Sequence, residues 1–513
     1  MTFFESLLVL LLVAIVLLQV SRRLHLPYPS MLALAGAGVA LIPGAPQVPI
    51  EPDTALALFI APALMDAAFD FPVGTARRFW VPLLVFAVGG VVVTTVLVAW
   101  VGWALAGLPL AAAVVLGAIV APPDAAAATA VLSTSGVPRS TDAILRGESL
   151  FNDAAALLLF GVALHIQSAG GLTAGTALHV AVALPGGVLL GIGVAWLTTR
   201  LNSFVAGTMG GVTLQFVTTF LTWIIAARLG LSSVLAIVAS AMTIARSSGN
   251  RTTARMRVQS YAVWGVAVFV LNVMAFLLMG MQAQGIVTKL SGDALDHAML
   301  FALIVVGVVI VARTIVAVGF NRGYAWYLRR QGRPEVSTVR QALLASWCGM
   351  RGLVTLATAF ALPSTFPQRD LVVLTAFGVV IATLVVQGLT LGPVIRILRL
   401  DLHESGASDV AKVRKQIAHA ALASLDETDN EEAAPLRAIY GFMCEAILEP
   451  ATGQRIVRFR EHAMAAIAAQ RAELDRARLD NRINVSEYND LLEDIDWWEI
   501  IALPDEGRRI EET

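Results

Sequence analysis

The stretch Gly117-Ala-Ile-Val-Ala-Pro-Pro-Asp124-Ala-Ala-Ala-Ala-Thr129 lies in the middle of an apolar segment that covers residues 110–133. Its two consecutive prolines remove two backbone donors and push the preceding residues out of α geometry. We therefore predict a transmembrane helix that is broken at mid-membrane, where non-helical backbone is tolerated only if it is packed in protein or lines a cavity. The carboxylate of Asp124 can coordinate a cation at this break, or it can simply cap the second half-helix.

The composition of the whole chain also indicates a membrane protein. Of its 513 residues 57% are apolar and only 14% are charged, whereas soluble domains are typically about 45–50% apolar. A hydrocarbon core of about 30 Å needs roughly 17–25 apolar residues per helix. Segments of this kind cover residues 3–20, 28–44, 54–69, 80–106, 110–133, 149–167, 178–199, 206–228, 230–245, 259–283, 298–320, 339–361 and 370–396. We predict an all-α polytopic membrane domain of about thirteen transmembrane helices in residues 1–400.

The remaining residues, 401–513, are rich in charge and are predicted to form a helical tail. The motif Asn484-Val-Ser-Glu487 has the pattern of a capping box that starts a helix, and residues 459–480 alternate arginine with acidic side chains. The tail contains no glycine-rich phosphate loop. Regulation, subunit contact and simple solubilisation are the roles that this composition allows.

The positions of the arginines predict the orientation in the membrane. If the N-terminus is outside, the outside loops hold only Arg228, Lys289 and Arg369, and the tail is cytoplasmic. The inside loops then hold Arg22, Arg23, Arg77, Arg78, Arg139, Arg146, Arg200, Arg246, Arg251, Arg255, Arg257, Arg322, Arg329, Arg330, Arg333 and Arg340. We expect an integral protein of the plasma membrane, such as a bacterial inner membrane, whose first apolar run is a retained span.

Several function classes find no support in the composition. The net charge is −1, so nothing points to a nucleic-acid partner. The two cysteines, Cys348 and Cys444, provide neither a disulfide framework nor a metal-ligand cluster. We expect no cofactor and no enzymatic chemistry.

A second motif, Gly147-Glu148-Ser149-Leu-Phe-Asn152-Asp153, opens another apolar segment. On a helix Ser149, Asn152 and Asp153 share one face, which carries a hydroxyl, an amide and a carboxylate. Oxygen ligands of this kind suit a hard cation and not a transition metal. A charged group at membrane depth costs at least about 2.5–3.5 kcal/mol, so Asp153 is the strongest functional candidate. A structural role is expected for Glu148.

A third motif, Ser346-Trp-Cys-Gly-Met-Arg351-Gly-Leu, is a second glycine-weakened helix with a buried cation. A buried arginine is expected to need a carboxylate partner, and we expect Glu148 to pair with Arg351, leaving the two aspartates free for ions. Arg313 either pairs with a remaining acid or snorkels to the interface. Asp66 lies in a short span and either lines the cavity or sits near the cytoplasmic end.

The two interrupted segments, 110–133 and 339–361, are seven elements apart and therefore cross the membrane in opposite directions. Broken helices at matching places in two inverted repeats point to a transport site at the midplane.

Together the motifs around Asp124, Asp153 and Arg351 resemble those of the sodium/proton exchangers of the monovalent cation:proton antiporter family. The resemblance extends to about residue 400 and leaves the tail uncovered. It implies a homodimer whose subunits have thirteen helices, with a dimerisation bundle and a core bundle in which two unwound helices cross beside the ion site. Its implied roles are cation and proton binding by Asp153 and Asp124, further oxygens from Ser149 and Asp66, support from Asn152, and an ion pair between Glu148 and Arg351.

The function implied is secondary active exchange of Na⁺ or Li⁺ for H⁺, serving pH and sodium homeostasis. Asn152 stands where an electrogenic relative has a second aspartate, which implies electroneutral exchange. Family members commonly have Thr-Asp-Pro where this chain has Pro123-Asp124-Ala125, so cation preference is open. A K⁺/H⁺ antiporter is the near alternative. A channel or receptor with structural ion pairs, or a symporter for an organic solute, is more distant.

Overall fold

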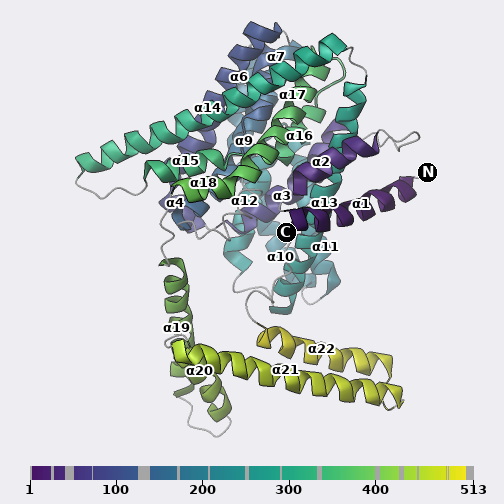
Figure 1. Cartoon of the computed structure of the whole chain (residues 1–513), viewed down its shortest axis with the longest axis vertical. Helices are drawn as coiled ribbons and strands as arrows, with labels where there is room; N and C mark the ends of the chain where they lie inside the picture. The colour runs from purple at the N-terminus through teal and green to yellow at the C-terminus, as the bar shows by residue number, and fades with distance from the viewer. Residues whose placement is uncertain are drawn as a thin grey trace. The chain divides into compact units, whose positions relative to one another are not determined.

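The computed structural model describes most of the chain, and its described residues form helices with short connections (Figure 1). These residues divide into two compact units, Met1–Leu402 and His403–Glu512. The described residues are 3–24, 28–40, 51–71, 73–124, 139–169, 171, 174–205, 208–248, 254–288, 292–331, 338–398, 405–426, 433–446, 450–480, 482 and 484–503. All regular elements in these ranges are helical, which confirms the predicted all-α class.

The first unit is built from long apolar helices. Within the described ranges seven helices are long and apolar enough to cross a membrane, and five shorter apolar helices accompany them. The polytopic prediction is thus confirmed, while the number thirteen stays a prediction. The elements are α1 (Phe3–Leu24), α2 (Tyr28–Val39), α3 (Pro52–Phe69), α4 (Val73–Arg78), α5 (Trp80–Leu84), the π-helical turn η1 (Val85–Gly89), α6 (Gly90–Ala106), α7 (Leu110–Val120), α9 (Arg139–Ala169), α10 (Ala174–Val205), α11 (Met209–Arg228), α12 (Ser233–Ser248), α13 (Ala254–Val287), α14 (Gly292–Arg330), α15 (Val339–Trp347), α16 (Leu353–Phe360), α17 (Arg369–Ala382), the π-helical turn η2 (Thr383–Gln387) and α18 (Gly388–Leu398).

The second predicted helix break is present, and at the first one the structure shows where the leading half-helix ends. Helix α7 ends at Val120 because the prolines that follow cannot continue it, and residues 121–124 run on without helical structure. The predicted second half of this span, residues 125–138, lies outside the described residues. The second break separates α15 from α16 and covers residues 348–352. The breaks contact each other, since the amide of Asp124 donates to the carbonyl of Met350 at 2.7 Å.

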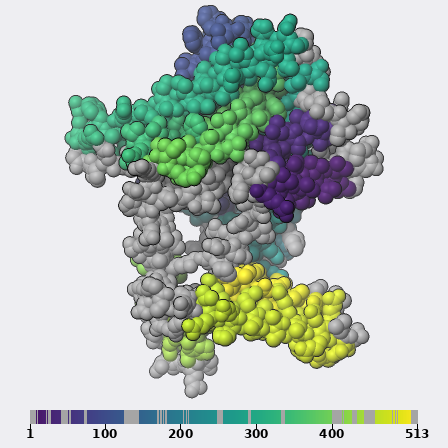
Figure 2. Space-filling model, in the orientation of Figure 1, coloured from purple at the N-terminus to yellow at the C-terminus, as the bar shows by residue number. Residues whose placement is uncertain are grey.

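Glycines bring several helices into backbone contact around these breaks. A Cβ added to Gly117 of α7 would lie 2.5 Å from the carbonyl oxygen of Thr95 in α6. Helices α2 and α13 cross in the same way, because Gly36 and Gly280 each face a backbone carbonyl of the other helix. Small residues allow such close approach where helices associate in a membrane. Figure 2 shows α14, in teal, against the green segment that contains α15 to α18.

The second unit consists of α19 (Ser405–Asp426), α20 (Ala434–Ala446), α21 (Pro450–Leu479) and α22 (Val485–Ala502). Its predicted capping box is confirmed: the side chain of Asn484 accepts from the amide of Glu487 at 2.9 Å, and the carboxylate of Glu487 accepts from the amide of Asn484 at 2.8 Å. Helices α21 and α22 pack together, and Arg471 forms ion pairs with Asp496 and Glu499 across them.

Candidate cation site

Arg351 lies at the point where two half-helices end. Its guanidinium is almost fully buried, with 1% of the residue exposed. The Nε atom donates to the carbonyl of Val120, the last residue of α7, at 2.7 Å, and Nη1 donates to the carbonyl of Gly349, just beyond α15. Helix C-termini carry a partial negative charge and unpaired carbonyls. The buried cation is therefore stabilised by the two helix ends that meet at it.

This arrangement corrects the predicted ion pair between Glu148 and Arg351. Glu148 of α9 pairs instead with Arg313 of α14, through bonds of 2.5 Å from Nη1 and 3.0 Å from Nη2. Arg313 also donates to the carbonyl of Ala345 at 3.1 Å. The prediction was wrong because it assumed that only a carboxylate can compensate a buried arginine. The breaks supply backbone carbonyls for Arg351, and Glu148 is left for Arg313.

The two glycines that flank Arg351 make room for charged neighbours. The side chain of Arg313 packs directly on Gly349, and the carboxylate of Asp124 packs directly on Gly352, so that a Cβ at either glycine would overlap them. The φ of Gly352 is −140°, so it is the contact with Asp124, and not a positive φ, that favours glycine at this position. Gly352 is the N-cap of α16. The Asp124 carboxylate thus sits at the positive end of a half-helix, where a negative charge is favoured.

Asn152 links α9 to the first break. Its side-chain Nδ2 donates to the carbonyl of Pro123 at 3.0 Å, and the residue is completely buried. Within the described part of the chain its Oδ1 atom has no hydrogen-bond partner. Asp153 follows directly on α9, and its carboxylate interacts electrostatically with that of Asp124. The structure therefore brings the two predicted acids together, with an orphaned amide oxygen on the adjacent residue.

The other two predicted oxygen ligands lie on α9 and α3. Ser149 is half-buried one turn before Asp153 on α9. Asp66 is half-buried in the last turns of α3, a helix that packs against both α9 and α16, and it interacts electrostatically with Tyr261 of α13. Asp70 caps the end of α3, where burial raises the pKa of its carboxyl and Arg146 opposes that rise.

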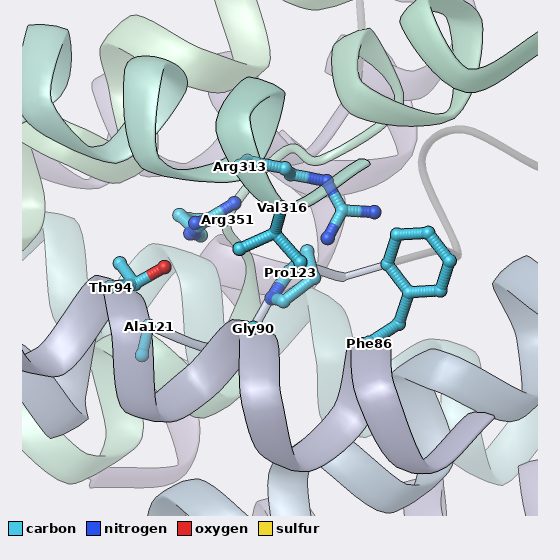
Figure 3. Close-up of a pocket in the computed structure, with 8 residues that line it drawn as sticks. All are labelled: Phe86, Gly90, Thr94, Ala121, Pro123, Arg313, Val316 and Arg351. Carbon is cyan, nitrogen blue, oxygen red and sulfur yellow. The ribbon is translucent and has the colours of Figure 1, made fainter. Parts of the chain in front are cut away.

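A small cavity adjoins the first break on the side of the arginines (Figure 3). The two charged residues that line it, Arg313 and Arg351, are both cationic. In this view they lie above Pro123 and Thr94. The lining residues are Phe86, Gly90, Thr94, Ala121, Pro123, Arg313, Val316 and Arg351. Neither Asp124 nor Asp153 is among these lining residues.

Sequence reasoning missed two features of the site. The sequence left the partner of Arg313 open, although its place inside an apolar segment signalled that it needed one. The role of Gly352 was also missed, and the signal for it was the pair of glycines flanking Arg351 in Gly349-Met-Arg-Gly352.

Residues 7–397 match the family described as "Sodium/hydrogen exchanger, transmembrane". The chain belongs to this family. The exchanger is 31% identical over 427 residues to the Na⁺/H⁺ exchanger Rv2287 of Mycobacterium tuberculosis, with 80% of this chain and 77% of that protein covered. It is 29% identical to the "Sodium, potassium, lithium and rubidium/H(+) antiporter" of Bacillus pumilus, over 71% of this chain and 57% of that one.

The exchanger's fold is similar to that of a solved structure, the sodium proton antiporter MjNhaP1 of Methanocaldococcus jannaschii. The TM-score is 0.60 at 15% identity, with 79% of this chain and 100% of that chain covered. At this identity the likeness concerns the fold. Membership of the family makes the exchanger a membrane cation/proton antiporter, a class of transporters and not of enzymes.

Proposed function

We propose that the exchanger binds Na⁺ or Li⁺ and H⁺ alternately at Asp153 and Asp124, and exchanges them one for one. The observation that carries this proposal is the meeting of the two acids where the helix breaks cross. Oxygen ligands are what a hard monovalent cation requires, and discontinuous helices supply them at membrane depth. Ser149 and Asp66 contribute further oxygens, and Asn152 holds the first break against α9.

Competition between the two ions gives the coupling. A bare carboxylate pair is costly to bury, so the site is stable when it holds either a proton or a cation. Only these occupied forms, which carry the same net charge, cross between the two faces of the membrane, by movement of the bundle that contains both breaks. Each cycle therefore carries a cation one way and a proton the other. Asn152 contributes no second charge, which supports electroneutral exchange.

K⁺/H⁺ antiport is the second candidate. It is supported by the relative from Bacillus pumilus, whose name includes sodium, potassium, lithium and rubidium. A channel or receptor that uses its buried charges only as ion pairs is disfavoured, because the chain belongs to a family of sodium/hydrogen exchangers.

The proposed setting is the plasma membrane, with the N-terminus outside and the tail cytoplasmic, as the distribution of arginines indicates. We infer a homodimer with no nucleic-acid partner. The physiological role would be pH and sodium homeostasis.

The test uses everted vesicles from a host that lacks its own exchangers. An acid-inside pH gradient is imposed, and NaCl, LiCl or KCl is then added while a fluorescent weak base reports the gradient. Sodium or lithium is expected to dissipate the gradient in the wild type and to have no effect with Asp153→Asn. Asp293→Asn serves as the matched control and should behave as the wild type. Asp293 lies in the first turn of α14 and is far in sequence from both helix breaks.

Three outcomes would contradict parts of this proposal. Full activity of Asp153→Asn would remove Asp153 from the site. A response to potassium alone would select the second candidate. A rate that changes when the membrane potential is clamped to different values would refute electroneutral exchange.

A further inference from the structure

A single peptide group stands between the acid site and the π-helical turn η2. The carbonyl of Met350 and the amide of Arg351 belong to the same peptide bond. On one side this peptide accepts from the amide of Asp124 at 2.7 Å. On the other side it donates to the hydroxyl of Thr383 at 3.0 Å. Because a peptide group is planar and rigid, a hydrogen bond on one edge fixes the orientation of the other.

Thr383 is well placed to hold this peptide. It is the first residue of η2 and is completely buried. Its hydroxyl donates to the carbonyl of Val379 at 2.8 Å, which leaves the oxygen free to accept from Arg351. Single π-helical turns inside α-helices are frequent at functional sites because they redirect side chains. The hydroxyl also satisfies an amide that the second break would otherwise leave unpaired in a dry interior.

We propose that Thr383 is a positioning residue for cation binding: its hydroxyl orients the Met350–Arg351 peptide, and that peptide holds the backbone of Asp124 in place. The link runs from the carbonyl of Val379 to the hydroxyl of Thr383, across the peptide, and to Asp124. Connected hydrogen bonds of this kind reinforce one another. This inference rests on the proposed function, because it assumes that Asp124 binds the transported cation.

The same span provides a matched control. Thr375 of α17 is also a completely buried threonine, but within the described part of the chain its hydroxyl has no hydrogen-bond partner. Valine has the shape of threonine without the hydroxyl, and serine keeps the hydroxyl. Thr383→Val therefore removes the bond, Thr383→Ser retains it, and Thr375→Val makes the same chemical change where no bond is lost.

The experiment measures sodium-dependent dissipation of the pH gradient by each full-length variant over a range of sodium concentrations and pH values. We expect Thr383→Val to raise the apparent KM for sodium about tenfold, which corresponds to about 1.4 kcal/mol. Thr383→Ser should stay within about twofold of the wild type, and Thr375→Val should be unchanged. A purely structural role would lower the amount of folded protein, and thus Vmax, without moving KM or the pH profile.

The outcomes distinguish a failure of the positioning role from a failure of the proposed function. If the wild type shows no cation response, the proposed function fails. If the wild type responds but Thr383→Val keeps its KM and pH profile, or Thr375→Val changes them equally, the positioning role is overturned. A raised KM for sodium in Thr383→Val, together with a KM near the wild-type value in Thr383→Ser, supports the positioning role.

Discussion

The ion pair between Glu148 and Arg313 gives the sharpest stability prediction. Both side chains are buried, with 2% of the Glu148 side chain and 9% of the Arg313 side chain exposed. Breaking a buried pair by removing one partner typically costs about 3–5 kcal/mol, because the other charge is left uncompensated. We therefore expect Glu148→Gln and Arg313→Gln each to lower the free energy of unfolding by an amount near the lower end of this range, since glutamine keeps some hydrogen bonding.

A double-mutant cycle isolates the pair. The double variant contains no uncompensated charge from this pair, so it should be more stable than the sum of the two single losses predicts, by about 2 kcal/mol or more. The assay is unfolding of the purified protein in detergent, followed by tryptophan fluorescence. A second cycle combines Glu148→Gln with Arg351→Gln and should give a clearly smaller coupling, since Arg351 is held by the carbonyls of Val120 and Gly349.

Equal or larger coupling between Glu148 and Arg351 would refute this reasoning. It would mean that the carboxylate, and not the two helix ends, compensates Arg351.

Three further predictions follow from single contacts. Gly352→Ala should abolish transport or raise the cation KM more than about tenfold, because a methyl group there displaces the Asp124 carboxylate, and uptake assays at varied sodium measure it. Gly280→Leu should destabilise the crossing of α2 and α13 by at least about 1–3 kcal/mol, measured by thermal unfolding in detergent. In the tail, the hydrogen bond from Arg482 lowers the pKa of Glu473. The small contribution of this hydrogen bond to stability is therefore present above the unfolded pKa of about 4.3, and it is lost as the pH falls through the lower folded pKa.

Each of these three predictions has its own control. Gly307→Ala of α14 and Gly285→Leu of α13 place a Cβ where no atom of a neighbouring element lies within 4 Å, and both should be tolerated better than the changes at Gly352 and Gly280. An equal loss in these controls would show that the packing argument is misplaced. For the tail, hydrogen exchange of α21 in the full chain is compared between wild type and Glu473→Gln. A difference between them that does not shrink as the pH falls below the unfolded pKa of about 4.3, or that is absent near neutral pH, contradicts the assignment.

Local sequence chemistry predicted a large part of the fold. The all-α class and the apolar spans follow from length and composition, because each helix satisfies its own backbone groups within a few residues. The two breaks follow from the consecutive prolines before Asp124 and the glycines around Arg351. The capping box at Asn484 was likewise readable as a local signal.

The partners of buried charges were not predictable in this way. The sequence placed Glu148, Arg313 and Arg351 in apolar segments and so indicated that each needs compensation if it is buried, since an isolated charge at membrane depth is costly. It did not determine which groups compensate each one, because Glu148 and Arg313 are 165 residues apart, and Arg351 contacts a carbonyl that is 231 residues away. Only tertiary packing brings the ends of α7 and α15 to Arg351, and it thereby releases Glu148 to Arg313. The sequence by itself thus specified the charges and the helix breaks, and the tertiary structure assigned each charge its partner.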